Sequence, residues 1–115
     1  MNFSAETRSE EDETIVLAFS GVLDLETVQA AEAAFAAAEE RQPKRVVLDL
    51  SDVEFIDSTG LRLIVSADTR TRRNGLMLQI VKGPDRVHRV FRLTLMNERL
   101  AFIDRAPGEG PTSSP

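Results

Sequence analysis

The sequence contains no cysteine, no tryptophan and no tyrosine among its 115 residues, and only one histidine. Without cysteine the chain forms neither a disulfide nor a thiolate-ligated zinc site, and a single histidine does not build a multi-histidine metal centre. No apolar run approaches the roughly 20 residues that cross a bilayer, and the first residues lack the basic and apolar stretches of a secretory signal. A chain of this length suits one domain, so we expect a single globular domain in the cytoplasm.

Positive charge is scarce in the first half of the chain. Residues 1–58 carry 14 acidic and 4 basic side chains, whereas residues 59–115 carry 5 acidic and 10 basic ones, and the overall net charge is −5. This asymmetry is typical of two solvated surfaces of opposite sign, and it also suits a face that steers a charged protein partner. Nucleic-acid binding is disfavoured, because the total charge is acidic and no tryptophan or tyrosine can stack on bases.

Strand-like and helical patterns alternate along the chain. Runs rich in β-branched and aromatic residues predict strands, and apolar positions spaced three or four apart predict helices. The expected strands are residues 3–8, 14–19, 45–50, 76–81 and 100–103, and the expected helices are residues 25–41, 58–73 and one that starts at 83–85. This order, β-β-α-β-α-β-α-β, predicts a single α/β domain with a mixed sheet, parallel crossovers and helices packed mainly on one face. We assign residues 1–105 to the domain and residues 106–115, rich in proline, glycine and serine, to a flexible tail.

The segment 51–61 connects a predicted strand to the next helix. Phe55 and Ile56 are expected to turn back into the core, and Ser58 lies where a helix N-cap is expected. A capping serine accepts a hydrogen bond from a backbone N–H and contributes about 1 kcal/mol. On spacing alone this structural role is the ordinary interpretation. The alternative is a hydroxyl that is exposed at a rigid helix tip and available for modification.

Catalytic motifs are absent or weak. The serine motif does not match the Gly-x-Ser-x-Gly turn of esterases, and His88, which we expect to be a half-exposed helix residue, is poorly placed as a base for it. No glycine-rich phosphate loop is present. Asp49, Asp52, Glu54 and Asp57 are dense enough for a receiver or metal-dependent phosphatase site, but a solvated rim is the more ordinary interpretation. We therefore expect no enzyme activity, no metal and no cofactor on this chain.

Three segments, in this order, resemble the sulphate-transporter and anti-sigma-antagonist (STAS) domain in its stand-alone bacterial form, the anti-anti-sigma factor. They are Gly21-Val22-Leu23-Asp24 before the first helix, Val46-Val47-Leu48-Asp49-Leu50-Ser51-Asp52-Val53 as the central strand, and Asp57-Ser58-Thr59-Gly60-Leu61 as the phosphorylation motif. The resemblance covers about residues 3–104. Leu95 departs from it, because the family often has a glycine there, in a left-handed conformation after the third helix.

The resemblance implies a regulatory switch. The unphosphorylated protein would capture an anti-sigma factor, itself a serine kinase that binds ATP and Mg²⁺, and would thereby free the sigma factor. Phosphorylation would end this capture, and a serine phosphatase would reset the switch. Ser58 is the implied phosphoacceptor, and the implied partner contacts are Asp24, Asp57, Thr59, Gly60 and Arg62. A non-phosphorylated interaction module, such as a scaffold or a lipid-transport accessory subunit, stays open as the alternative, and so does a weak homodimer; we expect no membrane contact.

Physical arguments add three expectations. Backbone N–H groups of residues 59–61 could hold a phosphate on Ser58, whereas the carboxylate of Asp57 would repel it, so we expect phosphorylation to block docking rather than to unfold the domain. Gly60, without a side chain, would let a partner or a phosphate approach closely. The turns that carry Asp24 and Asp57 should lie at the same end of the sheet.

Overall fold

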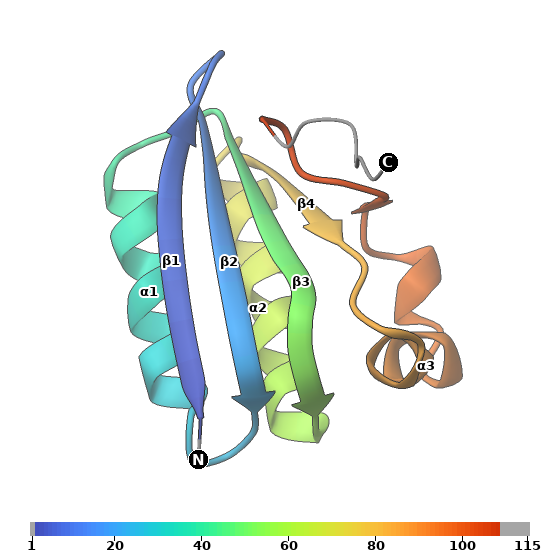
Figure 1. Cartoon of the computed structure of the whole chain (residues 1–115). Helices are drawn as coiled ribbons and strands as arrows, with labels where there is room; N and C mark the ends of the chain where they lie inside the picture. Colours follow the sequence, from blue (N-terminus) through green and yellow to red (C-terminus); the bar gives the residue numbers. More distant parts are fainter. Residues whose placement is uncertain (1, 109–115) are drawn as a thin grey trace, which may run out of the picture.

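The computed structural model describes residues 2–108, which follow the predicted element order with one additional 3₁₀ turn, η1 (Figure 1). The elements are β1 Phe3–Glu10, β2 Thr14–Leu23, α1 Val28–Glu40, β3 Arg45–Ile56, α2 Ser58–Arg73, β4 Met77–Val81, α3 Asp85–Leu93, η1 Met96–Glu98 and β5 Phe102–Ile103. Within these described residues, none of the helices is long and apolar enough to cross a membrane. The predicted α/β class is confirmed.

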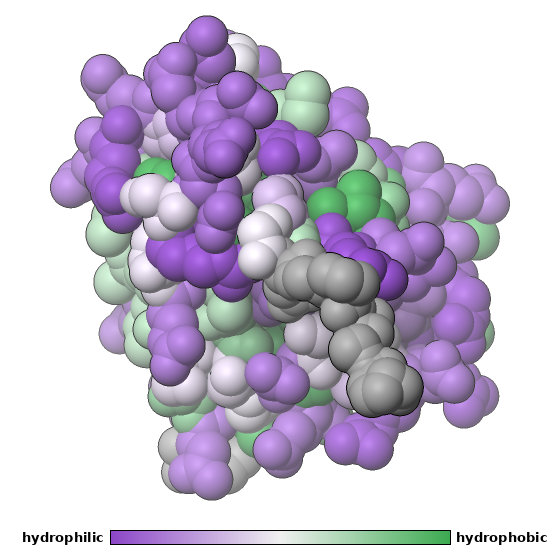
Figure 2. All heavy atoms as spheres, turned by 45° about the horizontal axis from the view of Figure 1, so that its top comes forward, coloured by the Kyte–Doolittle hydropathy of each residue, from purple (hydrophilic) through white to green (hydrophobic). Residues whose placement is uncertain are grey.

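The five strands form one sheet in the order β1-β2-β3-β4-β5. β1 and β2 form an antiparallel hairpin, whereas β2, β3, β4 and β5 run parallel to one another. The hairpin turn, residues 11–13, is acidic, and Figure 2 shows hydrophilic residues gathered over that end of the molecule. Because β2 and β3 are parallel and pair from Thr14–Arg45 to Leu23–Ile56, the loops that follow them emerge at the same end of the sheet.

The main core lies between the sheet and the helices. α1 and α2 cover one face of the sheet, and α3 lies beside it, beyond β4 (Figure 1). The helices contribute almost fully enclosed side chains, among them Phe35 from α1, Ile64 from α2 and Phe91 from α3, which join strand residues such as Leu17 and Leu48 in one cluster. Each such side chain contributes about 1.5–3 kcal/mol through its burial. Helix packing mainly on one face is as predicted.

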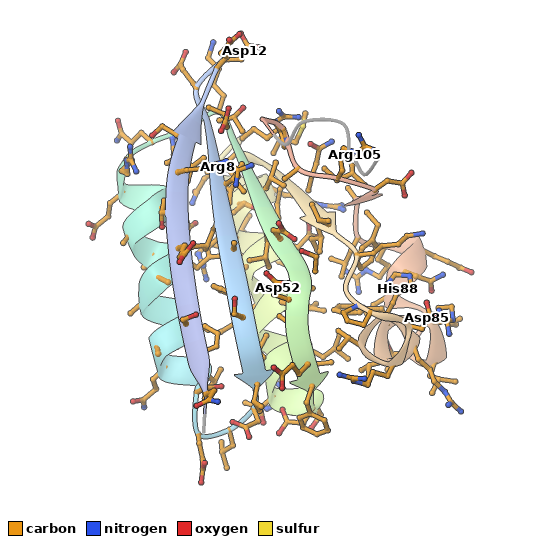
Figure 3. All side chains as sticks on the ribbon, in the orientation of Figure 1. Arg8, Asp12, Asp52, Asp85, His88 and Arg105 are labelled. Carbon is orange, nitrogen blue, oxygen red and sulfur yellow. The ribbon has the colours of Figure 1, made fainter. Side chains whose placement is uncertain are left out.

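The opposite face of the sheet is partly covered by the chain that follows β5. Ala106 is buried against one valine from each of β2, β3 and β4, and the guanidinium of Arg8 donates to the carbonyl oxygen of Pro107 at 2.7 Å. Figure 3 shows Arg8 and Arg105 at this end of the face. The segment predicted to be a flexible tail therefore begins with residues that pack on the sheet, and its residues 109–115 lie outside the described part of the chain.

β2 and β3 are longer than predicted, because irregular pairing lets both strands continue where the sequence suggested loops. β2 continues past its predicted end at residue 19. Gly21 lies within the strand at φ 93°, where a β-carbon would collide with the carbonyl group of Asn2. β3 continues past Leu50 to Ile56, which is buried as predicted. Phe55 does not turn into the core, since 52% of it is exposed.

The helix ends also differ from the predicted ones. α1 begins at Val28 because residues 25–27 form a turn. After α3, Leu95 adopts the left-handed conformation at φ 62°. The resemblance implied this backbone conformation with a glycine, and here a leucine adopts it. β5 contains two residues, Phe102 and Ile103, and is shorter than the predicted strand at residues 100–103.

His88 is a buried part of the α3 packing, not the half-exposed residue that the sequence suggested. Only 8% of it is exposed, and its ring meets the ring of Phe102 edge-on with centroids 4.7 Å apart. Removal from water lowers the pKa of His88, and the positive charges of Lys82 and Arg92 lower it further, against a smaller opposing effect of Asp85. The imidazole therefore serves as a neutral packing group.

Candidate functional site

The loops after β2 and β3 meet at one end of the sheet, as predicted. The backbone N–H of Asp57 donates to the carbonyl oxygen of Leu23 at 3.3 Å, which joins the two loops directly. Asp24 follows Leu23 in the chain, so the turns that hold Asp24 and Asp57 are neighbours. In parallel α/β sheets, this carboxyl end of the strands is the usual position of binding sites.

Asp57, not Ser58, caps α2. Its Oδ1 atom accepts hydrogen bonds from the N–H groups of Thr59 at 2.9 Å and Gly60 at 3.1 Å, and its carbonyl oxygen accepts from the N–H of Leu61 at 3.0 Å. Ser58 is the first residue of the helix itself. The interpretation of Ser58 as the N-cap is therefore wrong, because the preceding carboxylate already fills that role.

The hydroxyl of Ser58 is exposed at the helix tip, and its side chain makes no hydrogen bond within residues 2–108. The N–H groups of residues 59–61, which we expected to hold a phosphate, are all engaged by Asp57. A phosphate on Ser58 would therefore project away from the helix start for as long as the cap stays formed. The exposed hydroxyl is chemically available for modification, and the fold does not depend on it.

Gly60 lies beneath the helix start rather than on the surface. It is buried, and a β-carbon at this position would lie 2.7 Å from the carbonyl oxygen of Leu23 and 2.9 Å from Cγ1 of Ile56. A β-carbon essentially never lies within 3.0 Å of a non-bonded heavy atom, so any larger residue here would force the packing apart. The missing side chain thus lets α2 pack against the ends of β2 and β3. The expectation that Gly60 opens space for a partner is wrong, and any effect of Gly60 on docking is indirect.

Asp24 organises the loop between β2 and α1. Its Oδ1 atom accepts from the N–H groups of Glu26 at 3.0 Å and Thr27 at 3.3 Å. The buried hydroxyl of Thr27 donates to the carbonyl oxygen of Val22 at 2.8 Å and accepts from the N–H of Asp24 at 3.0 Å. Such reciprocal side-chain to backbone bonds fix a turn. Asp24 therefore shapes the loop as well as carrying charge at its surface.

Two exposed apolar side chains flank the candidate site, and the exposure of neither was predicted from the sequence. Leu25 is 72% exposed on the loop after β2, and Phe55 is 52% exposed near the end of β3. Each stands next to acidic residues in the sequence, in Asp24-Leu25-Glu26 and in Glu54-Phe55. That pattern, a large apolar residue beside an acidic one at a strand end, was the available signal. Large exposed apolar side chains grouped at one site are typical of protein interfaces.

Thr59 and Arg62, two of the predicted partner contacts, line a shallow groove between α1 and α2. The groove has a volume of about 280 Å³ and is formed by Val28, Gln29, Glu32, Thr59, Arg62, Leu63 and Ser66. Arg62 is exposed at its rim. The structure therefore brings the exposed Ser58 and Arg62 together with the half-buried Asp24, Asp57 and Thr59 at one end of the molecule. Of the predicted site residues, only Gly60 is buried.

The acidic residues of β3 do not form a metal centre. Asp49 is buried, and its Oδ1 atom accepts from the N–H of Ser51 at 2.9 Å, whereas Asp52 lies on the face of the sheet opposite the helices (Figure 3). Within the described range, no group of three or more histidine, cysteine, aspartate or glutamate side chains is arranged to hold a metal ion. These residues are spread along the strand instead of converging.

Comparison with known proteins places the chain in one family. The model of a family described as "Mlab, STAS domain" matches residues 6–103. An anti-sigma-B factor antagonist of Staphylococcus aureus is 30% identical over 94 residues, which are 82% of this chain and 86% of that protein. An anti-sigma-B factor antagonist of Listeria monocytogenes is 27% identical over 109 residues, 95% of each chain.

Solved structures of antagonists have the same fold. An anti-sigma factor antagonist from Mycobacterium paratuberculosis superposes with a TM-score of 0.77 at 24% identity, covering 90% of this chain and 87% of that one. The anti-sigma factor antagonist SpoIIAA in its unphosphorylated form superposes with a TM-score of 0.67 at 16% identity, covering 90% of each chain. At these identities the likeness is one of fold.

Proposed function

The chain belongs to the STAS domain family, and we propose that it is an anti-sigma factor antagonist switched off by phosphorylation of Ser58. In this proposal the unphosphorylated protein docks on an anti-sigma factor that is also a serine kinase, and the sigma factor is released. The kinase binds the ATP and Mg²⁺, a serine phosphatase removes the phosphate, and this chain needs no cofactor and performs no catalysis of its own. The names of its relatives in Staphylococcus aureus and Listeria monocytogenes support an antagonist role.

One observation carries the proposal: Ser58 presents an exposed hydroxyl at a helix tip that another residue caps. Asp57 makes the capping hydrogen bonds at 2.9 and 3.1 Å, so Ser58 is free to enter a kinase active site without loss of the helix start. Thr59, the neighbouring hydroxyl residue, is less accessible. A kinase that approaches this end of the sheet therefore meets the Ser58 oxygen first.

The docking surface consists of Ser58, its exposed neighbours Leu25, Phe55 and Arg62, and the half-buried Thr59. Leu25 and Phe55 would anchor the complex, because apolar side chains buried at the centre of an interface supply most of its binding energy. Their exposure favours a partner that offers an apolar socket at this end of the sheet.

The phosphate acts in this proposal by excluding the partner, not by changing the fold. It would add about −1.5 to −2 charge at Ser58, next to the carboxylate of Asp57 and without access to the N–H groups that Asp57 holds. A partner carboxylate about 5 Å away would be repelled by roughly 3 kcal/mol per unit charge at an effective dielectric constant of 20. Since about 1.4 kcal/mol is a tenfold change, each unit of phosphate charge weakens binding by about a hundredfold.

Phosphorylation mapping tests the proposal. The protein is used to capture its partner from the cells that produce it, the complex is incubated with ATP and Mg²⁺, and the modified residue is located by mass spectrometry. We expect one phosphate on Ser58, none on the Ser58→Ala variant, and an unchanged phosphate on the matched Thr59→Ala variant. Phosphate on Thr59, or a captured partner that transfers no phosphate, would contradict the assignment.

A further inference from the structure

The end of α3 carries a surface that the proposed docking does not use. Leu93 and Leu95 are 72% and 61% exposed, and the guanidinium groups of Arg89 and Arg92 are exposed beside them on the helix. Within residues 2–108, neither arginine forms an ion pair. We call these four residues the α3 patch. It combines two apolar side chains with two positive charges, which is the composition of a surface that binds an acidic, apolar partner.

Leucine is an unfavourable residue for the backbone conformation at position 95. The residue adopts the left-handed conformation at φ 62°, which favours glycine and costs a leucine about 1 kcal/mol or more. Its side chain is mostly exposed, so burial in the core does not compensate for this strain. Backbone strain that no contact within the folded chain compensates for is typical of functional positions.

A surface of complementary composition lies at the carboxyl ends of β2 and β3 of the same molecule. We call it the acidic patch, formed by Leu25, Glu26, Glu54 and Phe55, all of them exposed. It pairs two apolar side chains with two negative charges. The start of α3 adjoins this patch, because Nε of Arg86 donates to the carbonyl oxygen of Glu54 at 2.9 Å, and the α3 patch lies at the other end of the same helix. Figure 1 shows α3 beside the half of β3 that ends at this patch.

We propose that the α3 patch binds the acidic patch of a second copy of this chain, and that the two copies form a two-fold dimer. Because each copy carries both patches, which are of opposite sign and matched apolar content, one two-fold axis can form both contacts at once. The uneven charge of the chain, with acids concentrated before residue 59 and bases after it, makes a second copy an electrostatic match.

The dimer has a regulatory consequence, and this part of the inference rests on the proposed function. The acidic patch includes Leu25 and Phe55, which also belong to the docking surface around Ser58. Self-association therefore covers the surface that a kinase needs, so dimer and partner complex exclude each other. A high concentration of the free protein would then limit its own availability for docking.

The test measures self-association of the protein alone by analytical ultracentrifugation, from micromolar to millimolar concentration. We expect a monomer–dimer equilibrium that weakens about tenfold when salt screens the charges. One double variant, Arg89→Glu with Arg92→Glu, makes the α3 patch acidic. A second, Glu26→Lys with Glu54→Lys, makes the acidic patch basic. Each should be monomeric alone, and an equal mixture should form dimers again, because both contacts are then attractive.

Thermal melts of both variants serve as the folding control, since all four side chains are exposed and Arg86 bonds only the backbone of Glu54. A wild-type chain that stays monomeric at millimolar concentration would overturn the proposal, and so would two folded variants that fail to associate when mixed. Growth into larger oligomers would overturn the two-fold arrangement. No kinase is present in these measurements, so their failure is independent of any failure of the proposed function.

Discussion

The division of roles between Asp57 and Ser58 gives a sharp stability prediction. In the structure, the Asp57 carboxylate accepts two backbone hydrogen bonds at the start of α2, whereas Ser58 accepts none of the capping bonds. Replacing Asp57 with alanine removes the cap, and replacing Ser58 with alanine removes only an exposed hydroxyl. The two single substitutions therefore separate a structural residue from one that is available for modification.

The expected magnitudes follow from the cap and its charge. Loss of an N-cap costs about 1 kcal/mol, and loss of a negative charge at a helix N-terminus costs a further 0.3–1 kcal/mol or so. Asp57→Ala should therefore lower the free energy of unfolding by about 1.5 kcal/mol, Asp57→Asn, which retains a cap, by about 0.5 kcal/mol, and Ser58→Ala by less than about 0.5 kcal/mol.

Urea unfolding measures these differences. With a slope of roughly 1.5 kcal/mol per molar urea, the Asp57→Ala midpoint should fall by about 1 M, and the Ser58→Ala midpoint should stay within about 0.3 M of the wild type. If Ser58→Ala proved as destabilising as Asp57→Ala, Ser58 would contribute to the cap, and the argument that its hydroxyl is free for a kinase would fail.

Three further substitutions test other parts of the structure. Gly60→Ala should lower the free energy of unfolding by about 2 kcal/mol, because the new methyl group would meet the Leu23 carbonyl oxygen; an unchanged urea midpoint would refute this packing argument. The pKa of His88 is below its usual value, so acidification through about 6.5 protonates the unfolded state first and lowers stability. The urea midpoint of the wild type should therefore fall between pH 7.5 and 5.5, and the fall should be smaller in His88→Leu, which has no imidazole to protonate. Leu95→Gly should raise stability by about 0.5–1 kcal/mol through relief of the left-handed leucine, while it weakens the proposed dimer; a thermal melt and ultracentrifugation check the two effects.

Element order and class could be predicted from the sequence because they depend on local patterns. Alternating β-branched runs and helical stripes, such as the one that places Phe35 in the core, specify each element without knowledge of its neighbours. The position of the Asp24 and Asp57 turns at one end of the sheet followed from the parallel crossovers alone.

The details that the sequence did not predict depend on contacts between distant segments. A glycine at position 21 suggests a strand end, yet β2 continues through it with a register shift, and the backbone of Asn2, just before β1, leaves no room for a side chain. The sequence suggested that Gly60 is accessible, but the packing of α2 on β2 and β3 buries it. We predicted a half-exposed His88, because the ring that encloses it, Phe102, belongs to a later element of the chain. In each case tertiary packing outweighed the local signal.

The candidate site was predictable in its residues but not in their roles. The motif identified Ser58, and the structure exposes it as the hypothesis required. Ser, Thr and Asp are all good N-caps, so the sequence alone did not decide between Asp57 and Ser58. The exposed Leu25 and Phe55 were missed because strand ends with isolated apolar residues usually turn them inward.

The most direct test of the central claim compares the affinity of one partner for two forms of this protein. The anti-sigma factor is titrated by calorimetry with the unmodified chain and with the chain that carries a single phosphate on Ser58, under the same salt and without ATP. We predict that the phosphorylated form retains its cooperative melt and binds at least about a hundredfold more weakly. Equal affinity of the two forms, or loss of the folded state on phosphorylation, would contradict it.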